Sequence, residues 1–134
     1  MSNLYRVITE AAWTDAQKHH YVARCGNDQK ADRTHLNLRE AVESIAAAYF
    51  DPKEKPLVLE IDISGFSDRI EWLEPTGNNG WKQPLADIPN IPVSAVIRVL
   101  RLLHTRADDD GNVFTLALFA LRIDKLLSHC FGNE

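Results

Sequence analysis

Hydrophobic and polar residues alternate over several short stretches of the chain, which is the pattern expected of β-strands with one buried face. The clearest case covers residues 57–63, where the odd positions are leucine or isoleucine and are predicted to face the core, with Glu60 and Asp62 facing outward. Residues 4–9 predict another strand, and they place Arg6 on an otherwise apolar face. Shorter patterns predict further strands over residues 21–23, 34–36, 70–74, 96–103 and 113–116.

Helical spacing of apolar residues occurs in three other parts of the chain. It predicts a short helix over residues 10–20 and a C-terminal helix over residues 117–131. Asn37 and Glu40 have the spacing of a capping box, so a helix is expected from Asn37 to about Phe50. Two segments predict no regular structure: the polar residues 25–33, and residues 75–92, which hold four of the 6 prolines.

The order of these elements is strand, helix, strand, helix, several strands and a last helix. Strands dominate the second half, which favours an α+β fold over the regular alternation of an α/β fold. A length of 134 residues suits one compact domain. The 45% of hydrophobic and 25% of charged residues are ordinary values for a globular protein.

Charge and cysteine content narrow the class of protein. The chain has 15 Lys+Arg and 19 Asp+Glu, and the net charge of −4 weighs against nucleic-acid binding through bulk charge. Cys25 and Cys130 form no CxxC or zinc pattern, so a reduced, cytoplasmic setting is expected. The first residues lack the pattern of a signal peptide, and the most apolar stretch, residues 113–121, is too short to cross a bilayer.

Common catalytic and cofactor motifs are absent from the sequence, including glycine-rich phosphate loops and the GxSxG nucleophile motif. The adjacent His19 and His20 would point about 100° apart on a helix, so no metal site is expected. Arg6 on its strand and His35 before a predicted helix N-terminus are less generic, and together they suit an anion site. The alternatives are a solvent-exposed edge position for Arg6 and a structural hydrogen bond for His35.

Several segments, in this order, carry a family resemblance. They are residues 4–13 (LYRVITEAAW), 34–37 (THLN), 58–62 (VLEID), 71–74 (EWLE), 95–99 (AVIRV) and 110–114 (DGNVF). Together they resemble the small bacterial and plant proteins grouped as domain of unknown function 952. The resemblance divides the chain into a domain over residues 1–116 and a C-terminal helical extension over residues 117–134, packed on or beside the domain.

The resemblance implies an ADP-ribosyltransferase-like fold, in which two small, mostly antiparallel sheets and flanking helices surround a cleft. In enzymes of that fold the cleft takes NAD, and a first-strand His or Arg holds its ribose or nicotinamide end. By position that role would fall on Arg6, with His35 and Asn37 near the cleft floor. NAD is thus the one cofactor that the resemblance implies.

The chain departs from those enzymes where they carry a catalytic glutamate. Residues 81–85 (WKQPL) occupy that region and contain no acid, whereas an oxocarbenium-like transition state needs an anion. We therefore expect a degenerate cleft that binds a nucleotide or another small anionic ligand, with catalytic residues unknown. The candidate binding residues are Arg6, His35, Asn37, Trp81 and Gln83.

Two alternatives stay open at the level of sequence. The first is an active ADP-ribosyl or phosphoribosyl transferase whose acid is supplied by Glu71, Glu74 or Asp87. The second is a protein-interaction module, or a homodimer, that uses the predicted C-terminal helix.

Overall fold

The computed structural model describes residues 3–76, 80–106 and 112–121. Its largest unit is an antiparallel four-stranded sheet in the order β1-β4-β8-β9, formed by Leu4–Ile8, Leu57–Ile61, Val96–Arg106 and Asn112–Leu121. A second, three-stranded sheet has the order β3-β6-β5, formed by Thr34–His35, Gln83–Ala86 and Ile70–Leu73. A third pairing joins β2 (Tyr21–Val22) to β7 (Ile91–Pro92). This arrangement is the expected α+β class with small antiparallel sheets.

The helices in the described residues are short, and three of them are α-helical: α1 (Glu10–His19), α2 (Gly26–Ala31) and α3 (Val42–Tyr49). Single 3-10 turns are η1 (Arg39–Ala41), η2 (Pro52–Glu54), η3 (Ser67–Arg69) and η4 (Val93–Ala95). In α1 the hydroxyl of Thr9 accepts a hydrogen bond from the amide of Ala12 at 3.0 Å, and the helix ends at His20 in a left-handed conformation. None of the described helices is long and apolar enough to cross a membrane.

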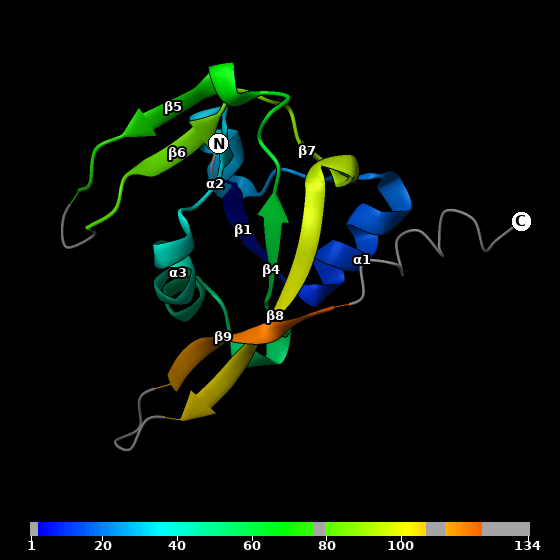
Figure 1. The fold of residues 1–134 in the computed structure, drawn as a ribbon, viewed down its shortest axis with the longest axis vertical. Helices are drawn as coiled ribbons and strands as arrows, with labels where there is room; N and C mark the ends of the chain where they lie inside the picture. Colours follow the sequence, from blue (N-terminus) through cyan, green and yellow to red (C-terminus); the bar gives the residue numbers. More distant parts are fainter. Residues whose placement is uncertain (1–2, 77–79, 107–111, 122–134) are drawn as a thin grey trace, which may run out of the picture.

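The four-stranded sheet is covered on both faces by helices. On one face Trp13 and Ala16 of α1 join the larger hydrophobic cluster, and on the other Val42 and Ala46 of α3 pack with residues of β1, β4 and β8. Figure 1 shows α1 and α3 on opposite sides of β1 and β4, with the β5–β6 hairpin projecting from this body. Every residue of β4 is therefore buried, which makes it the central strand of the fold.

The burial of Glu60 corrects the predicted alternation of buried and exposed residues over residues 57–63. Glu60 does not face solvent but is 8% exposed, and it accepts hydrogen bonds from Asn3 at 2.9 Å and from Arg98 at 2.6 Å. The strand itself is confirmed, since the pairing of β4 with β1 and β8 is what the apolar pattern required. The strand prediction for residues 4–9 and the helix prediction for residues 10–20 are also confirmed.

Four other predictions of local structure are wrong. Residues 25–33 are not a loop but contain α2, and residues 75–92 contain β6 and β7. Asn37 does not cap a helix, because its backbone pairs with Tyr5, and α3 begins only at Val42 after the turn η1. The helix predicted over residues 117–131 is wrong as far as Leu121, because β9 continues to that residue through its pairing with β8.

The rest of that predicted helix lies outside the described residues. Strand β9 runs across the boundary predicted between residues 116 and 117. The division of the chain at that boundary stays a prediction.

Candidate functional site

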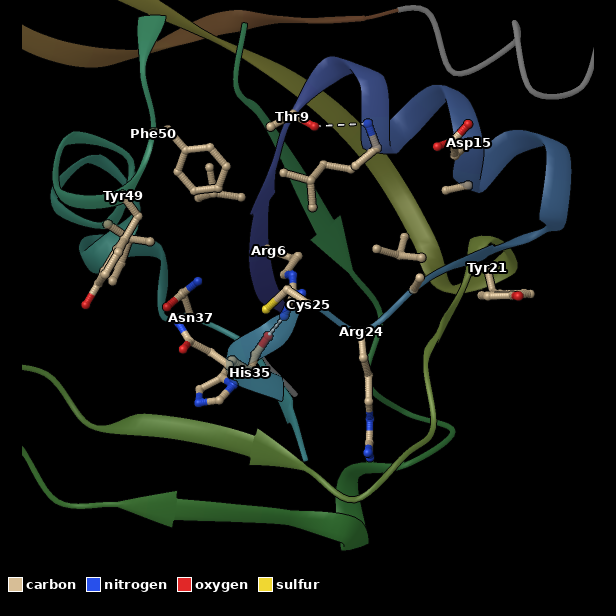
Figure 2. Close-up of a pocket in the computed structure, with 18 of the residues that line it drawn as sticks. Arg6, Thr9, Asp15, Tyr21, Arg24, Cys25, His35, Asn37, Tyr49 and Phe50 are labelled. Carbon is tan, nitrogen blue, oxygen red and sulfur yellow. Dashed lines mark hydrogen bonds between the residues drawn. The ribbon is translucent and has the colours of Figure 1, made fainter. Parts of the chain in front are cut away.

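A pocket of about 940 Å³ opens between β1, α1, α3 and the segment that runs from β2 to β3. Figure 2 shows its labelled side chains: Tyr49 and Phe50 lie on one side, Tyr21 on the other, and Arg6 and His35 between them. The pocket is thus lined both by β1 of the four-stranded sheet and by residues from other parts of the chain.

The base of the pocket holds a buried ion pair between β1 and α2. The side chain of Arg6 is 8% exposed, and its Nη2 donates to Oδ2 of Asp28 at 2.7 Å. Its Nη1 donates to Oδ1 of the same carboxylate at 3.3 Å and to the carbonyl oxygen of His35 at 2.6 Å. The two-fold contact fixes the guanidinium in one orientation, as paired arginine–carboxylate contacts do.

Asp28 is the centre of this network and is fully buried. Besides Arg6, its carboxylate accepts hydrogen bonds from the amide of Cys25 at 3.0 Å and from the amide of His35 at 2.9 Å. Burial by itself would raise the pKa of the carboxyl, but the hydrogen bonds and charge of Arg6 and the two amides hold that pKa well below its usual range. Asp28 is therefore ionised at neutral pH and acts only as an acceptor.

His35 connects the network to the pocket. Its Nδ1 lies 2.7 Å from Oδ1 of Asp28, and its side chain is 31% exposed. Strand β3 holds its backbone, because His35 pairs with Leu85 of β6 and the hydroxyl of Thr34 donates to the carbonyl oxygen of Ile88 at 3.0 Å. The imidazole thus lies between a buried carboxylate and an open cavity.

Asn37 and Gln83 tie the second sheet to the first beside this histidine. The amide of Asn37 donates to the carbonyl oxygen of Tyr5 at 2.7 Å, and the amide of Tyr5 donates back at 2.8 Å. The side-chain amide of Gln83 donates to the carbonyl oxygen of Leu36 at 2.5 Å. Both residues line the pocket, although these particular bonds hold the backbone of the segment that follows β3.

Arg24 brings a second cation to the pocket. Its Nη2 donates to the carbonyl oxygen of Ile88 at 2.7 Å and its Nη1 to the carboxylate of Asp32 at 2.8 Å. The side chain of Asp32 is 85% exposed, and hydrogen bonding to Arg24 lowers the pKa of that carboxyl. Because Asp32 is so exposed, its ion pair exchanges with solvent at little cost, whereas the Arg6–Asp28 pair does not.

The pocket walls are apolar and aromatic above this polar base. Val7 and Ile8 of β1, Ile45 of α3 and Phe50, which follows α3, line the pocket, and Val7 packs in one cluster with Ile45 and Phe50. Tyr49 is 69% exposed at one rim. At the other rim the rings of His19 and Tyr21 lie 6.0 Å apart at an interplanar angle of 38°. Exposed tyrosines beside a polar base suit a ligand with a planar ring and a polar group.

Four of the five predicted site residues line this one pocket: Arg6, His35, Asn37 and Gln83. Trp81 is not among the lining residues, and neither are Glu71, Glu74 and Asp87, which are exposed to solvent. The acid in the pocket wall is instead Asp15 of α1. Whether any of these residues binds a ligand stays a prediction.

The sequence reasoning missed Asp28, on which the whole base of the pocket depends. The usable signal was the spacing of Cys25 and Asp28, because an acidic residue three positions after a helix start can accept the amide of the capping residue. Arg24 was also missed, because it lies between the strand predicted over residues 21–23 and the loop predicted over residues 25–33.

Comparison with known proteins gives the fold and no activity. No family model and no curated protein matches the chain. The X-ray structure of protein CC0527 from Caulobacter crescentus is similar, with 22% identity and a TM-score of 0.68 over 85% of this chain and 94% of that one. The solution NMR structure of the same protein has 20% identity and a TM-score of 0.62 over 83% and 91% of the two chains. At this identity the likeness concerns the fold alone.

Proposed function

We propose that the chain is a binding protein whose pocket holds a small anionic ligand, and that a nucleotide is the ligand class. The observation that carries the proposal is the buried Arg6–Asp28–His35 network at the base of a 940 Å³ pocket. A network of this kind is costly to desolvate, and replacing it by apolar residues would be a simpler way to close the fold. Its position under a cavity favours a role in recognition.

The surroundings of the network favour an anion with a ring attached. Arg24 lines the pocket and its partner Asp32 is exposed, so a phosphate or carboxylate that reaches the guanidinium can replace that partner. Tyr49 and Tyr21 supply exposed aromatic faces at the two rims. The dimensions are those of a site for a molecule of drug or nucleotide size.

The resemblance to the domain of unknown function 952 family supports the same ligand class. We propose that the fold is ADP-ribosyltransferase-like and that Arg6 and His35 take the positions of the residues that hold NAD in such enzymes. None of the acids Glu71, Glu74 and Asp87 lines the pocket. We therefore propose binding, and not transfer by any of these three acids, as the function.

Isothermal titration calorimetry with ADP-ribose tests the proposal with a matched pair of variants on α1. Ala12 lines the pocket and Ala11 does not, although both are exposed. Ala12→Glu brings a negative charge to the pocket and is expected to weaken ADP-ribose binding about fivefold, as a charge at roughly 8 Å from an anion would. Ala11→Glu changes the net charge equally and is expected to leave the affinity unchanged.

Two results would contradict the proposal. One is the absence of heat and of any thermal shift with ADP-ribose or NAD at millimolar concentration. The other is an equal loss of affinity in both variants, because that would show an effect of net charge and not of the pocket.

A further inference from the structure

We propose that Asp28 fixes the ring of His35 with a proton on Nδ1, so that Nε2 of the neutral ring is a hydrogen-bond acceptor in the pocket and selects ligands that carry a hydroxyl as well as an anionic group. This inference rests on the proposed function, because it names the ligand chemistry of the same pocket. Asp28 is here a positioning residue, and His35 is the residue that makes a hydrogen bond to the ligand.

The first step is the direction of the hydrogen bond between the two side chains. The carboxylate of Asp28 makes five close contacts, two with Arg6, one with the amide of Cys25 and two with His35, and none of its other partners is an acceptor. A fully buried carboxylate that is paired with a guanidinium at 2.7 Å keeps its charge and has no proton to donate. The proton in the 2.7 Å contact with His35 therefore belongs to Nδ1.

The second step is the orientation of the ring. Oδ1 of Asp28 accepts from both the backbone amide of His35 at 2.9 Å and the ring nitrogen at 2.7 Å, so one oxygen anchors the residue at two points. Turning the ring over would place a carbon against this buried charge and lose the contact. The pairing of His35 with Leu85 prevents the backbone from following such a turn.

The third step is what the ring then offers to a ligand. Nε2 lies at the far side of the ring from Asp28, on a side chain that is 31% exposed and lines the pocket, and Figure 2 shows the ring of His35 beside Cys25 and Asn37. In the neutral ring this nitrogen is unprotonated and accepts a hydrogen bond. The guanidinium of Arg6, which donates to the carbonyl oxygen of His35 at 2.6 Å, is a donor only.

The acceptor on His35 and the donor on Arg6 together indicate the chemistry of the ligand. The guanidinium group of Arg6 favours an anionic oxygen in the pocket, and Nε2 of His35 favours an O–H of the same ligand. Phosphorylated sugars and nucleotides carry both groups, whereas inorganic phosphate and the phosphate esters of simple alcohols carry no sugar hydroxyl. A site built to accept from a hydroxyl rejects analogues without one, because its acceptor is then left unpaired.

Nitrogen NMR on the full-length, uniformly ¹⁵N-labelled chain tests the tautomer without any ligand. Long-range ¹H–¹⁵N spectra at about pH 9, where free imidazoles are neutral, are expected to show a protonated Nδ1 and an unprotonated Nε2 for His35, assigned by their loss in His35→Gln. In Asp28→Asn the side-chain amide can donate as well as accept, so Nε2–H is expected to appear. The wild-type spectrum decides alone if this variant does not fold. An Nε2–H tautomer, or a doubly protonated ring, in the wild-type protein would overturn the inference.

A second arm uses ADP-ribose as the probe. At saturation the Nε2 resonance of His35 is expected to shift, and His35→Phe is expected to lose about tenfold in affinity, the effect of one hydrogen bond. An unchanged Nε2 resonance in a protein whose other pocket amides shift would refute the selection by His35 while the proposed function stands. If no pocket amide shifts, the proposed function fails, and the tautomer of the free protein then decides the assignment of Asp28 by itself.

Discussion

Replacing Arg6 by methionine should destabilise the protein strongly, and more at neutral pH than in acid. Methionine keeps most of the volume of the buried side chain but removes the charge, two hydrogen bonds to Asp28 and one to the carbonyl oxygen of His35. The carboxylate, which is fully buried, then keeps only amide and imidazole donors. Removing one partner of a buried pair in this way costs about 3–5 kcal/mol. This is a large part of the unfolding free energy of a typical domain, which is about 5–15 kcal/mol.

The dependence on pH follows from the sign of the pKa shift. The pKa of Asp28 is lower in the folded protein than in the unfolded chain, where it is about 3.9. Its contribution to stability is therefore complete above that unfolded value and is lost as the pH falls below it. In Arg6→Met the lowering contribution of the guanidinium is gone, so protonation of Asp28 in acid relieves the penalty. The loss in unfolding free energy should shrink between pH 7 and pH 3.5.

Urea denaturation followed by tryptophan fluorescence measures both quantities, because Trp13 is buried in the core. Arg39→Met is the control: Arg39 is 44% exposed and pairs with Glu43 on the same helical segment, so its loss should cost at most about 0.5 kcal/mol. Combining Arg6→Met with Asp28→Asn should cost less than the sum of the two single substitutions. A loss for Arg6→Met below about 1 kcal/mol at pH 7, or strict additivity in the double variant, would refute the account of the network.

Three further predictions concern the fold and the pocket. Leu59→Ala, at a fully buried position of the central strand β4, should lower the unfolding free energy by about 2–5 kcal/mol in urea, and a loss under 1 kcal/mol would contradict the two-sided core. Thr9→Ala removes the cap of α1 and should cost about 1 kcal/mol, with Thr9→Ser restoring the stability. Asp15→Asn removes a negative charge from the pocket wall and should tighten ADP-ribose binding about two- to fivefold by calorimetry, whereas weaker binding would show that Asp15 contacts the ligand as an acceptor.

The parts of the fold that local patterns determine could be predicted from the sequence. Strand β1, helix α1 and strand β4 each carry a run of residues whose spacing matches one period, and the structure has all three. The burial of Glu60 could not be predicted, because it depends on contacts with Asn3 and Arg98, which are distant in sequence. A local alternation shows that one face is buried but does not show whether the other is covered.

Strand β9, at the end of the described residues, was predicted incorrectly for a different reason. Residues 112–121 are apolar at almost every position, a composition that fits a buried strand as well as a helix. The partner decides the outcome: β8 offers an open edge, and β9 satisfies its backbone by pairing with it from Asn112 to Leu121. That edge is a product of the tertiary fold and leaves no trace in the local sequence.

The residues of the candidate site likewise fall into two groups, those that the local sequence could single out and those that it could not. Arg6 and His35 could be singled out because a charge on an apolar strand and a histidine before a helix are locally unusual. Asp28 could not, because it lies in a short polar helix and acts through contacts with residues 22 positions before it and 7 positions after it. Trp81 was selected by its place in the resemblance and is absent from the pocket lining.

The most direct test of the central claim is to map the ADP-ribose site by amide NMR. If the pocket above the Arg6–Asp28–His35 network binds the ligand, the amides of Arg6, Cys25, His35 and Tyr49 should shift in a saturable manner. The amides of Glu71, Trp72 and Leu73 on the exposed strand β5 should stay in place. Saturable shifts confined to β5, or no saturable shift at millimolar ADP-ribose, would contradict the claim that this pocket is a nucleotide site.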